Sequence, residues 1–155
     1  MSLVHDFFLL YGEVEDYNLI NWYGENRDNW ENNVKLEDSI INYMSDTLEW
    51  IKSYNPELKE EINGLNYNGL TVIRNEGSKV LFKIIHGWIE IFSNAPNEIE
   101  IKNEIVWIDK EENDGYWDYN SVRYEKTLLL ERLSNILLFC EKAQHEKYFI
   151  LHCGI

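Results

Sequence analysis

Four side chains near the end of the chain have the chemistry of zinc ligands, namely Cys140, His145, His152 and Cys153. Their spacing argues against a zinc site, because they form no Cys-x-x-Cys or His-x-x-x-His pair. His152 and Cys153 are neighbours in a segment with the composition of a strand, where adjacent side chains point to opposite faces. The sequence therefore predicts two buried, reduced cysteines and neither a metal nor a cofactor.

Signatures of catalysis are also weak. The chain contains no Gly-x-Ser-x-Gly turn, and Gly77-Ser78-Lys79 lacks the preceding glycine of a phosphate-binding loop. With 28 Asp and Glu residues, a carboxylate pair able to serve as acid and base would arise by coincidence. We therefore predict that the protein is not an enzyme, and keep a small hydrolase with a carboxylate pair as a less favoured alternative.

Aromatic rings mixed with carboxylates give a stronger signal. Tyr116, Trp117 and Tyr119 lie within four residues of one another, next to Asp114 and Asp118. Aromatic residues are enriched at the centres of protein interfaces, and carboxylates pair with arginine and lysine. The alternatives are a solvated loop, or rings that fold back on the core with their polar ends outward.

An earlier segment, Glu13 to Glu31, has the same composition and reads as an irregular surface segment with aromatic residues interspersed. If the two segments meet on one face, they form a single acidic and aromatic patch. We predict that a partner-binding surface draws on Trp22, Tyr23, Glu111, Asp114, Tyr116, Trp117 and Asp118.

The overall charge narrows the class of partner. The 28 acidic residues outnumber the 14 basic ones, and the net charge of −14 repels nucleic acids and anionic membranes. The same charge accelerates encounter with a basic protein. No run of eighteen apolar residues is present, and two cysteines are too few for a disulfide-dependent secreted domain. A cytoplasmic location is expected.

The hydrophobic pattern predicts the elements that must position these residues. Short apolar or β-branched runs predict strands at Val4–Tyr11, Leu70–Arg74 and Tyr148–Cys153. Apolar stripes at helical spacing predict helices over Leu36–Tyr54, Gly77–Asn94 and Val122–Lys142.

The segment Glu98–Ile108 alternates with strand periodicity. Its odd positions Ile99, Ile101, Ile105 and Trp107 are predicted to form one buried face. The polar stretch Asp109–Asn120 is predicted to be a loop with a turn at Asp114-Gly115. A strand with one polar face suits an antiparallel sheet better than a buried parallel one. We therefore predict one α+β domain over residues 1–155, with about three main helices on a mixed or antiparallel sheet.

In size, acidity, richness in Asn, Ile, Tyr and Trp, and the segment Asp114-Gly115-Tyr116-Trp117-Asp118, the chain resembles the small acidic immunity proteins of bacterial toxin systems. The resemblance implies an inhibitor that covers a cognate basic toxin with an acidic, aromatic surface and needs no cofactor. The alternative is a homo-oligomeric or scaffold subunit, in which a copy of the same chain covers the exposed rings.

Overall fold

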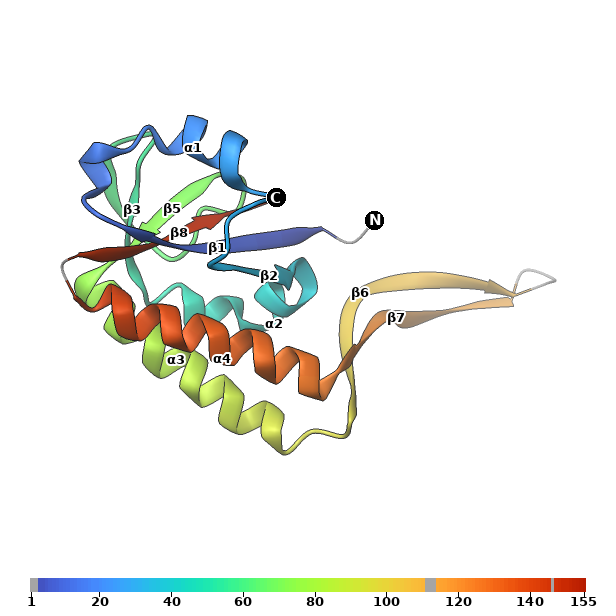
Figure 1. The fold of residues 1–155 in the computed structure, drawn as a ribbon. Coiled ribbons are helices and arrows are strands. Elements are labelled where there is room, and N and C mark those ends of the chain that lie inside the picture. The colour runs from blue at the N-terminus through green and yellow to red at the C-terminus, as the bar shows by residue number, and fades with distance from the viewer. Residues whose placement is uncertain (1–2, 111–113, 146) are drawn as a thin grey trace.

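Antiparallel strands in the order β2-β1-β8-β5-β3-β4 form the central sheet of this computed structural model, which describes residues 3–110, 114–145 and 147–155 (Figure 1). Every strand pair in this sheet is antiparallel. The fold is a single compact α+β domain, as predicted. The strands are β1 (Val4–Tyr11), β2 (Asn33–Glu37), β3 (Lys52–Asn55), β4 (Glu60–Asn63), β5 (Leu70–Ile73) and β8 (Tyr148–Cys153).

Both faces of the central sheet are buried. In β1, Phe7 and Leu9 belong to one hydrophobic cluster, whereas Phe8 and Leu10 belong to a second cluster on the other face. This is why Phe7–Leu10 is a continuous apolar run rather than an alternating one. The predicted strands at the two ends of the chain, β1 and β8, are confirmed with their predicted bounds and pair with each other.

Three long helices cover the first face of the sheet: α2 (Asp38–Leu48), α3 (Asn75–Ser93) and α4 (Lys126–Ala143) (Figure 1). The helix predicted over Leu36–Tyr54 is too long in both directions. Leu36 lies in β2 and Tyr54 in β3, because both flanking segments pair with other strands of the sheet.

The second face is covered by the acidic, aromatic segment near the N-terminus. It contains a short 3-10 helix (η1, Val14–Asp16) and α1 (Leu19–Asn26), so the prediction that it is irregular is wrong, although it lies at the surface with its carboxylates exposed. Its rings pack inward: Trp22 lies edge-on to Phe8 with ring centroids 5.4 Å apart, and Trp30 Nε1 donates a hydrogen bond of 3.0 Å to the carbonyl of Leu9. A sheet with two apolar faces needs cover on both, and these aromatic side chains provide it.

A two-stranded hairpin is inserted between α3 and α4 and projects away from the domain (Figure 1). We call it the arm: β6 (Glu98–Lys110) and β7 (Asp114–Glu125). The predicted loop Asp109–Asn120 is therefore wrong, since its residues from Asp114 onward lie in β7. Val122–Glu125, predicted as the start of a helix, also belongs to β7, because this segment pairs with the first residues of β6.

The buried face predicted for β6 holds in the first part of the strand and fails in the second. Ile99 and Ile101 are 7% and 3% exposed, whereas Ile105 and Trp107 are 57% and 47% exposed. The cause is that the arm leaves the domain here, because the large side chains on both of its faces become exposed, including Ile108 at 37% and Tyr116 at 44%. A β-bulge lies at the same place, between Lys102 and Ile105, where β6 uses one residue more than β7. The extra residue reverses the alternation, so the odd positions beyond the bulge point to the opposite face of the hairpin.

Candidate protein-binding site

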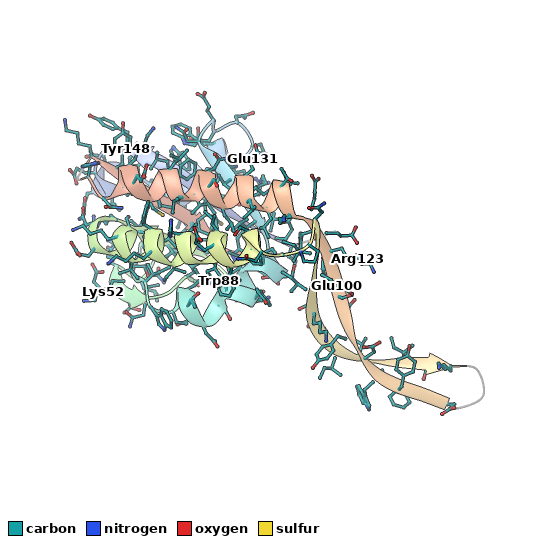
Figure 2. All side chains as sticks on the ribbon, turned by 90° about the horizontal axis from the view of Figure 1, so that it is seen from below. Lys52, Trp88, Glu100, Arg123, Glu131 and Tyr148 are labelled. Atoms are coloured by element: carbon teal, nitrogen blue, oxygen red, sulfur yellow. The ribbon has the colours of Figure 1, made fainter. Side chains whose placement is uncertain are left out.

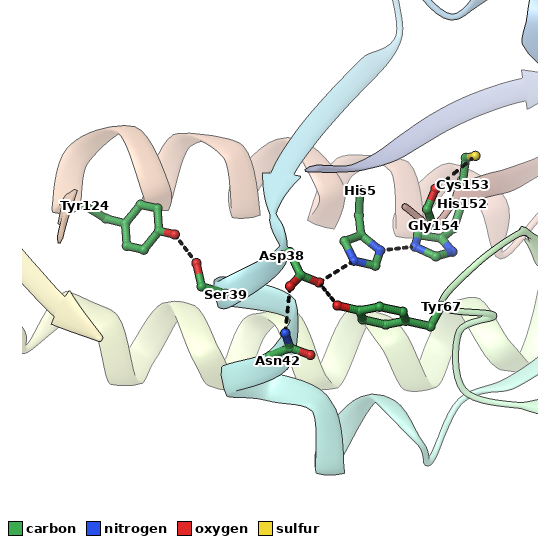
Figure 3. Close-up of polar contacts among 9 residues, drawn as sticks. All are labelled: His5, Asp38, Ser39, Asn42, Tyr67, Tyr124, His152, Cys153 and Gly154. Carbon is green, nitrogen blue, oxygen red and sulfur yellow. Dashed lines mark hydrogen bonds and ion pairs between the residues drawn. The ribbon is translucent and has the colours of Figure 1, made fainter. Parts of the chain in front are cut away.

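The base of the arm is built into the core. Ile99 and Ile101 belong to the hydrophobic cluster beneath the three long helices. Tyr124, which pairs with Ile99, packs against the same cluster, and its hydroxyl is hydrogen-bonded to Ser39 at the start of α2 (Figure 3). The first backbone N–H of α4, from Lys126, donates to the carbonyl of Asn97 over 2.8 Å and closes the base. The arm is therefore anchored at one end.

A buried polar network holds the part of α2 that carries this anchor (Figure 3). Asp38 Oδ1 lies 3.0 Å from Nε2 of His5, and Nδ1 of His5 lies 2.9 Å from Nε2 of His152. Thr71 Oγ1 accepts from the N–H of Asn66 over 2.8 Å, which leaves its hydroxyl hydrogen for Nδ1 of His152 at 3.4 Å. One consistent arrangement places the hydrogen of each imidazole on Nε2.

The network keeps its inner histidine neutral. His152 is fully buried, and burial together with the neighbouring His5 lowers the pKa of His152 well below its ordinary value. At the outer end, Asp38 also accepts from the hydroxyl of Tyr67 and from Nδ2 of Asn42 at 2.9 Å (Figure 3). The carboxylate therefore has partners on both oxygens and fixes the first turn of α2 next to Ser39.

The outer half of the arm, which we define as residues 105–110 and 114–119, exposes large apolar and aromatic side chains. Trp117 is 67% exposed, so it does not fold back on the core. Figure 2 shows side chains projecting from both faces of this part of the hairpin. The exposed large side chains here are Ile105, Trp107, Ile108, Tyr116, Trp117 and Tyr119.

One face of the outer half carries a pair of indoles. Trp107 pairs with Trp117 across the strands, and their rings meet edge-on with centroids 5.3 Å apart. Trp107 Nε1 donates to Asp109 Oδ1 over 2.5 Å. Tyr119 lies on the same face, with the ammonium of Lys102 5.1 Å from its ring centroid. These contacts restrict the rings and lower the entropy that a partner would have to remove on binding.

The opposite face is more acidic. By the strand alternation it carries Asp114, Tyr116 and Asp118, which pair with Lys110, Ile108 and Val106. Lys110 lies 4.9 Å from the ring centroid of Tyr116, so the ring and the cation cover one another. Asp114 and Asp118 are exposed.

The structure separates the residues predicted for a single patch. Asp114, Tyr116 and Asp118 share one face of the arm, while Trp117 lies on the other. Glu111 lies outside the described residues.

Trp22 and Tyr23 lie in α1, on the side of the central sheet opposite α3 and α4 (Figure 1). Tyr23 is half-buried, its hydroxyl lies 3.2 Å from Asp6 Oδ2, and burial raises its pKa. The two segments therefore do not meet on one surface.

Three exposed apolar residues of the arm were missed as site residues: Ile105, Trp107 and Ile108. Sequence reasoning placed Ile105 and Trp107 on a buried face because they continue the odd-numbered pattern. The signal that could have found them is the run Lys102-Asn103-Glu104, where an odd position is polar and the alternation stops.

A hydrolase with a carboxylate pair would need two acids in one hollow of the surface, with the pKa of one of them raised. A hollow of about 310 Å³ beside β3 is lined by two carboxylates, Glu61 and Glu76. Lys79 lowers the pKa of Glu76, so this group is an ionised member of an ion pair rather than an acid with a raised pKa. Within residues 3–110, 114–145 and 147–155, no group of three or more His, Cys, Asp or Glu side chains is placed to hold a metal ion.

No helix in the described part of the chain is long and apolar enough to span a membrane. Comparison of the chain with protein-family profiles, with curated proteins and with solved structures finds no match in any of the three.

Proposed function

We propose that this protein is a binding inhibitor of the immunity type, which neutralises a basic toxin by inserting the arm into a concave surface of that partner. The observation that carries the proposal is the exposure of aromatic side chains on both faces of a hairpin that projects from the domain. Monomeric proteins rarely leave so much apolar surface uncovered unless it binds something.

The shape of the arm favours insertion over flat docking. A flat interface would cover one face of the hairpin and leave the other in water, together with its exposed rings. A cleft contacts both faces at once, so the Trp107–Trp117 pair and the Tyr116 face are buried together. Rings of this kind supply most of the affinity at protein interfaces.

The charge of the arm favours a basic partner. The described residues of the outer half include three carboxylates, Asp109, Asp114 and Asp118, against one cation, Lys110. The whole chain carries −14, so its field attracts a positively charged protein from a distance and accelerates association. Occlusion of this kind needs neither a cofactor nor a catalytic group.

The test is co-purification of the tagged protein from its native cells at low and then moderate salt. We expect a stoichiometric basic protein that is released as the salt concentration rises and whose activity is suppressed in the complex. A variant that joins Lys102 to Ser121 through Asn-Gly removes the outer half at a position where these two residues already pair. This variant should fold and capture nothing.

Two charge variants then separate the arm from the general acidity of the chain. Asp114→Lys with Asp118→Lys should slow association with the captured partner at low salt. Glu60→Lys with Glu61→Lys makes the same charge change on exposed residues of the edge strand β4 and should slow it less. Equal effects of the two variants, or capture of the same partner by the variant without the outer half, would refute the arm as the binding site.

A further inference from the structure

A second exposed apolar surface lies on the body of the domain, where the end of α2 meets the middle of α3. It is a hollow of about 420 Å³ that we call the groove, and its apolar lining includes Trp50, Val80, Ile84, Gly87, Trp88 and Ile91. Trp50 and Ile91 are 66% and 57% exposed. This volume lies in the range of about 300–1,000 Å³ that is usual for binding pockets.

The groove is formed before anything binds. The indole of Trp88, which Figure 2 shows on α3, donates from Nε1 to Thr47 Oγ1 over 2.9 Å. Its ring also packs against Tyr43 and Phe92, with centroids 5.5 Å and 5.6 Å away. Because the ring is held from three sides, docking in the groove would cost little ordering entropy.

Gly87 adds an independent observation. It lies in the interior of α3, and a Cβ atom built on it would meet no other atom within 4 Å. Glycine in a helix interior costs about 0.5–1 kcal/mol relative to alanine. In the described part of the domain, no neighbouring atom lies so close to Gly87 that a side chain would be excluded there. The glycine therefore leaves the groove open at a cost in stability.

We propose that the outer half of the arm of a second copy of this chain docks in the groove, with two copies related by a two-fold axis. The arm begins after the C-terminal end of α3 and extends away from it, so it is placed to reach a neighbouring molecule rather than its own groove (Figure 1, Figure 2). A two-fold axis lets each copy insert its arm and receive the other, which covers both apolar surfaces at once.

The two surfaces match in chemistry. The arm offers Trp107 and Trp117, and the groove offers an apolar lining with one charged residue, Lys83. Lys83 is a cation in a chain of net charge −14, and it can pair with Asp109 of the incoming arm, which lies on the same face as Trp107 and Trp117. This charge match favours a copy of this acidic arm over a basic partner as the occupant of the groove.

This inference does not depend on the proposed function, and the two compete for the same arm. An arm docked in a second copy has its Trp107–Trp117 face covered, so the dimer is a form in which these two rings are protected until a tighter partner takes them. A groove variant that loses self-association should still bind the basic partner, which makes the failure of one proposal distinguishable from the failure of the other.

The test is sedimentation of the purified full chain over a range of micromolar concentrations. We expect a reversible dimer, weakened at least about tenfold by Trp117→Asp in the arm and equally by Ile91→Asp in the groove, a loss of about 1.4 kcal/mol. Ile20→Asp is the matched control, since Ile20 is 58% exposed on the opposite side of the sheet. A monomer at every concentration would overturn the proposal.

Mixing the two variants separates arm-in-groove docking from other contacts. Trp117→Asp keeps an intact groove and Ile91→Asp keeps an intact arm, so the mixed pair has one unchanged arm-groove contact. The mixture should therefore dimerise more tightly than either variant alone. Packing of arm against arm predicts no such recovery and would leave Ile91→Asp dimeric, and either result refutes the proposal.

A last variant, Gly87→Gln, adds a side chain to the lining of the groove, at a position where a Cβ atom meets no other atom within 4 Å. It should retain the fold and lose the dimer. Gly24→Gln, also at a position with open space, should keep the dimer. A dimer of unchanged affinity in Gly87→Gln would contradict docking in the groove.

Discussion

The indole of Trp107 lies edge-on to the indole of Trp117, with ring planes at 69°, and Gly115 makes room for this arrangement. A Cβ atom at position 115 would lie 2.2 Å from Cζ2 of Trp107. Gly115, which was predicted to form a turn, therefore lies within β7, where its lack of a side chain lets the Trp107 ring pack against the backbone.

Gly115→Ala is expected to displace the Trp107 ring and break its contact with Trp117. In an NMR spectrum of the indole N–H groups, the Trp107 and Trp117 resonances should move. The resonances of Trp22 and Trp30, which pack on the face of the sheet away from the groove, are the internal control and should remain in place. Unchanged Trp107 and Trp117 signals would show that the ring does not lie over Gly115.

Two isoleucines of β6 give a matched test of where the arm leaves the core. Ile101 is 3% exposed, so Ile101→Ala should lower the free energy of unfolding by about 2–5 kcal/mol, as deletion of buried aliphatic groups does. Ile105 is 57% exposed, and Ile105→Ala should change the free energy of unfolding by less than about 0.5 kcal/mol. Urea unfolding measures both variants, and equal losses would mean that Ile105 is packed as closely as Ile101.

The buried His152 predicts a pH dependence of stability. Its folded-state pKa is well below the ordinary value near 6.5. Below about pH 6.5 the unfolded chain therefore binds a proton at this imidazole, whereas the native protein does not. The free energy of unfolding should therefore fall as the pH drops below about 6.5, by at most about 1.4 kcal/mol per pH unit from this group.

Urea unfolding at several pH values, compared between the parent and His152→Gln, measures this contribution as a difference in slope. The overall stability of the variant is not the readout, because the substitution also removes buried hydrogen bonds. His145→Gln, at an exposed position, is the control and should keep the parental slope. A parental slope in His152→Gln would show that His152 is not the group responsible.

The two cysteines are expected to be unreactive in the native protein. Burial raises the pKa of Cys140 to about 12 and also raises the pKa of Cys153, so little thiolate is present near neutral pH. A thiol reagent at mildly alkaline pH should modify both cysteines of the protein unfolded in denaturant. In the native protein it should modify both of them much more slowly. Rapid reaction of the folded protein with one equivalent would contradict the burial of that thiol.

Parts of the chain could be predicted because local pattern and tertiary environment agree there. The apolar runs of β1 and β8 and the stripe of α3 predict their elements almost to the residue. The short strands β2, β3 and β4 were missed, because four or five mostly polar residues carry little periodicity and become strands by pairing with a neighbour.

The candidate site could be predicted in part. Asp114, Tyr116, Trp117 and Asp118 do lie together on one exposed hairpin, and their unusual mixture of rings and carboxylates was visible in the sequence. Trp22 and Tyr23 have the same composition around them but pack against the second face of the sheet. Composition cannot distinguish a ring that covers a core from one that meets water, because both are amphipathic.

The sequence by itself determined the α+β class, the three long helices and the net acidity, because these follow from periodicity and from charge summed along the chain. The tertiary structure decided which rings are exposed. That outcome depends on the place where the arm leaves the core, between Ile101 and Ile105, and on a second apolar sheet face that needed cover. Both are relations between segments distant in the sequence, which local periodicity does not record.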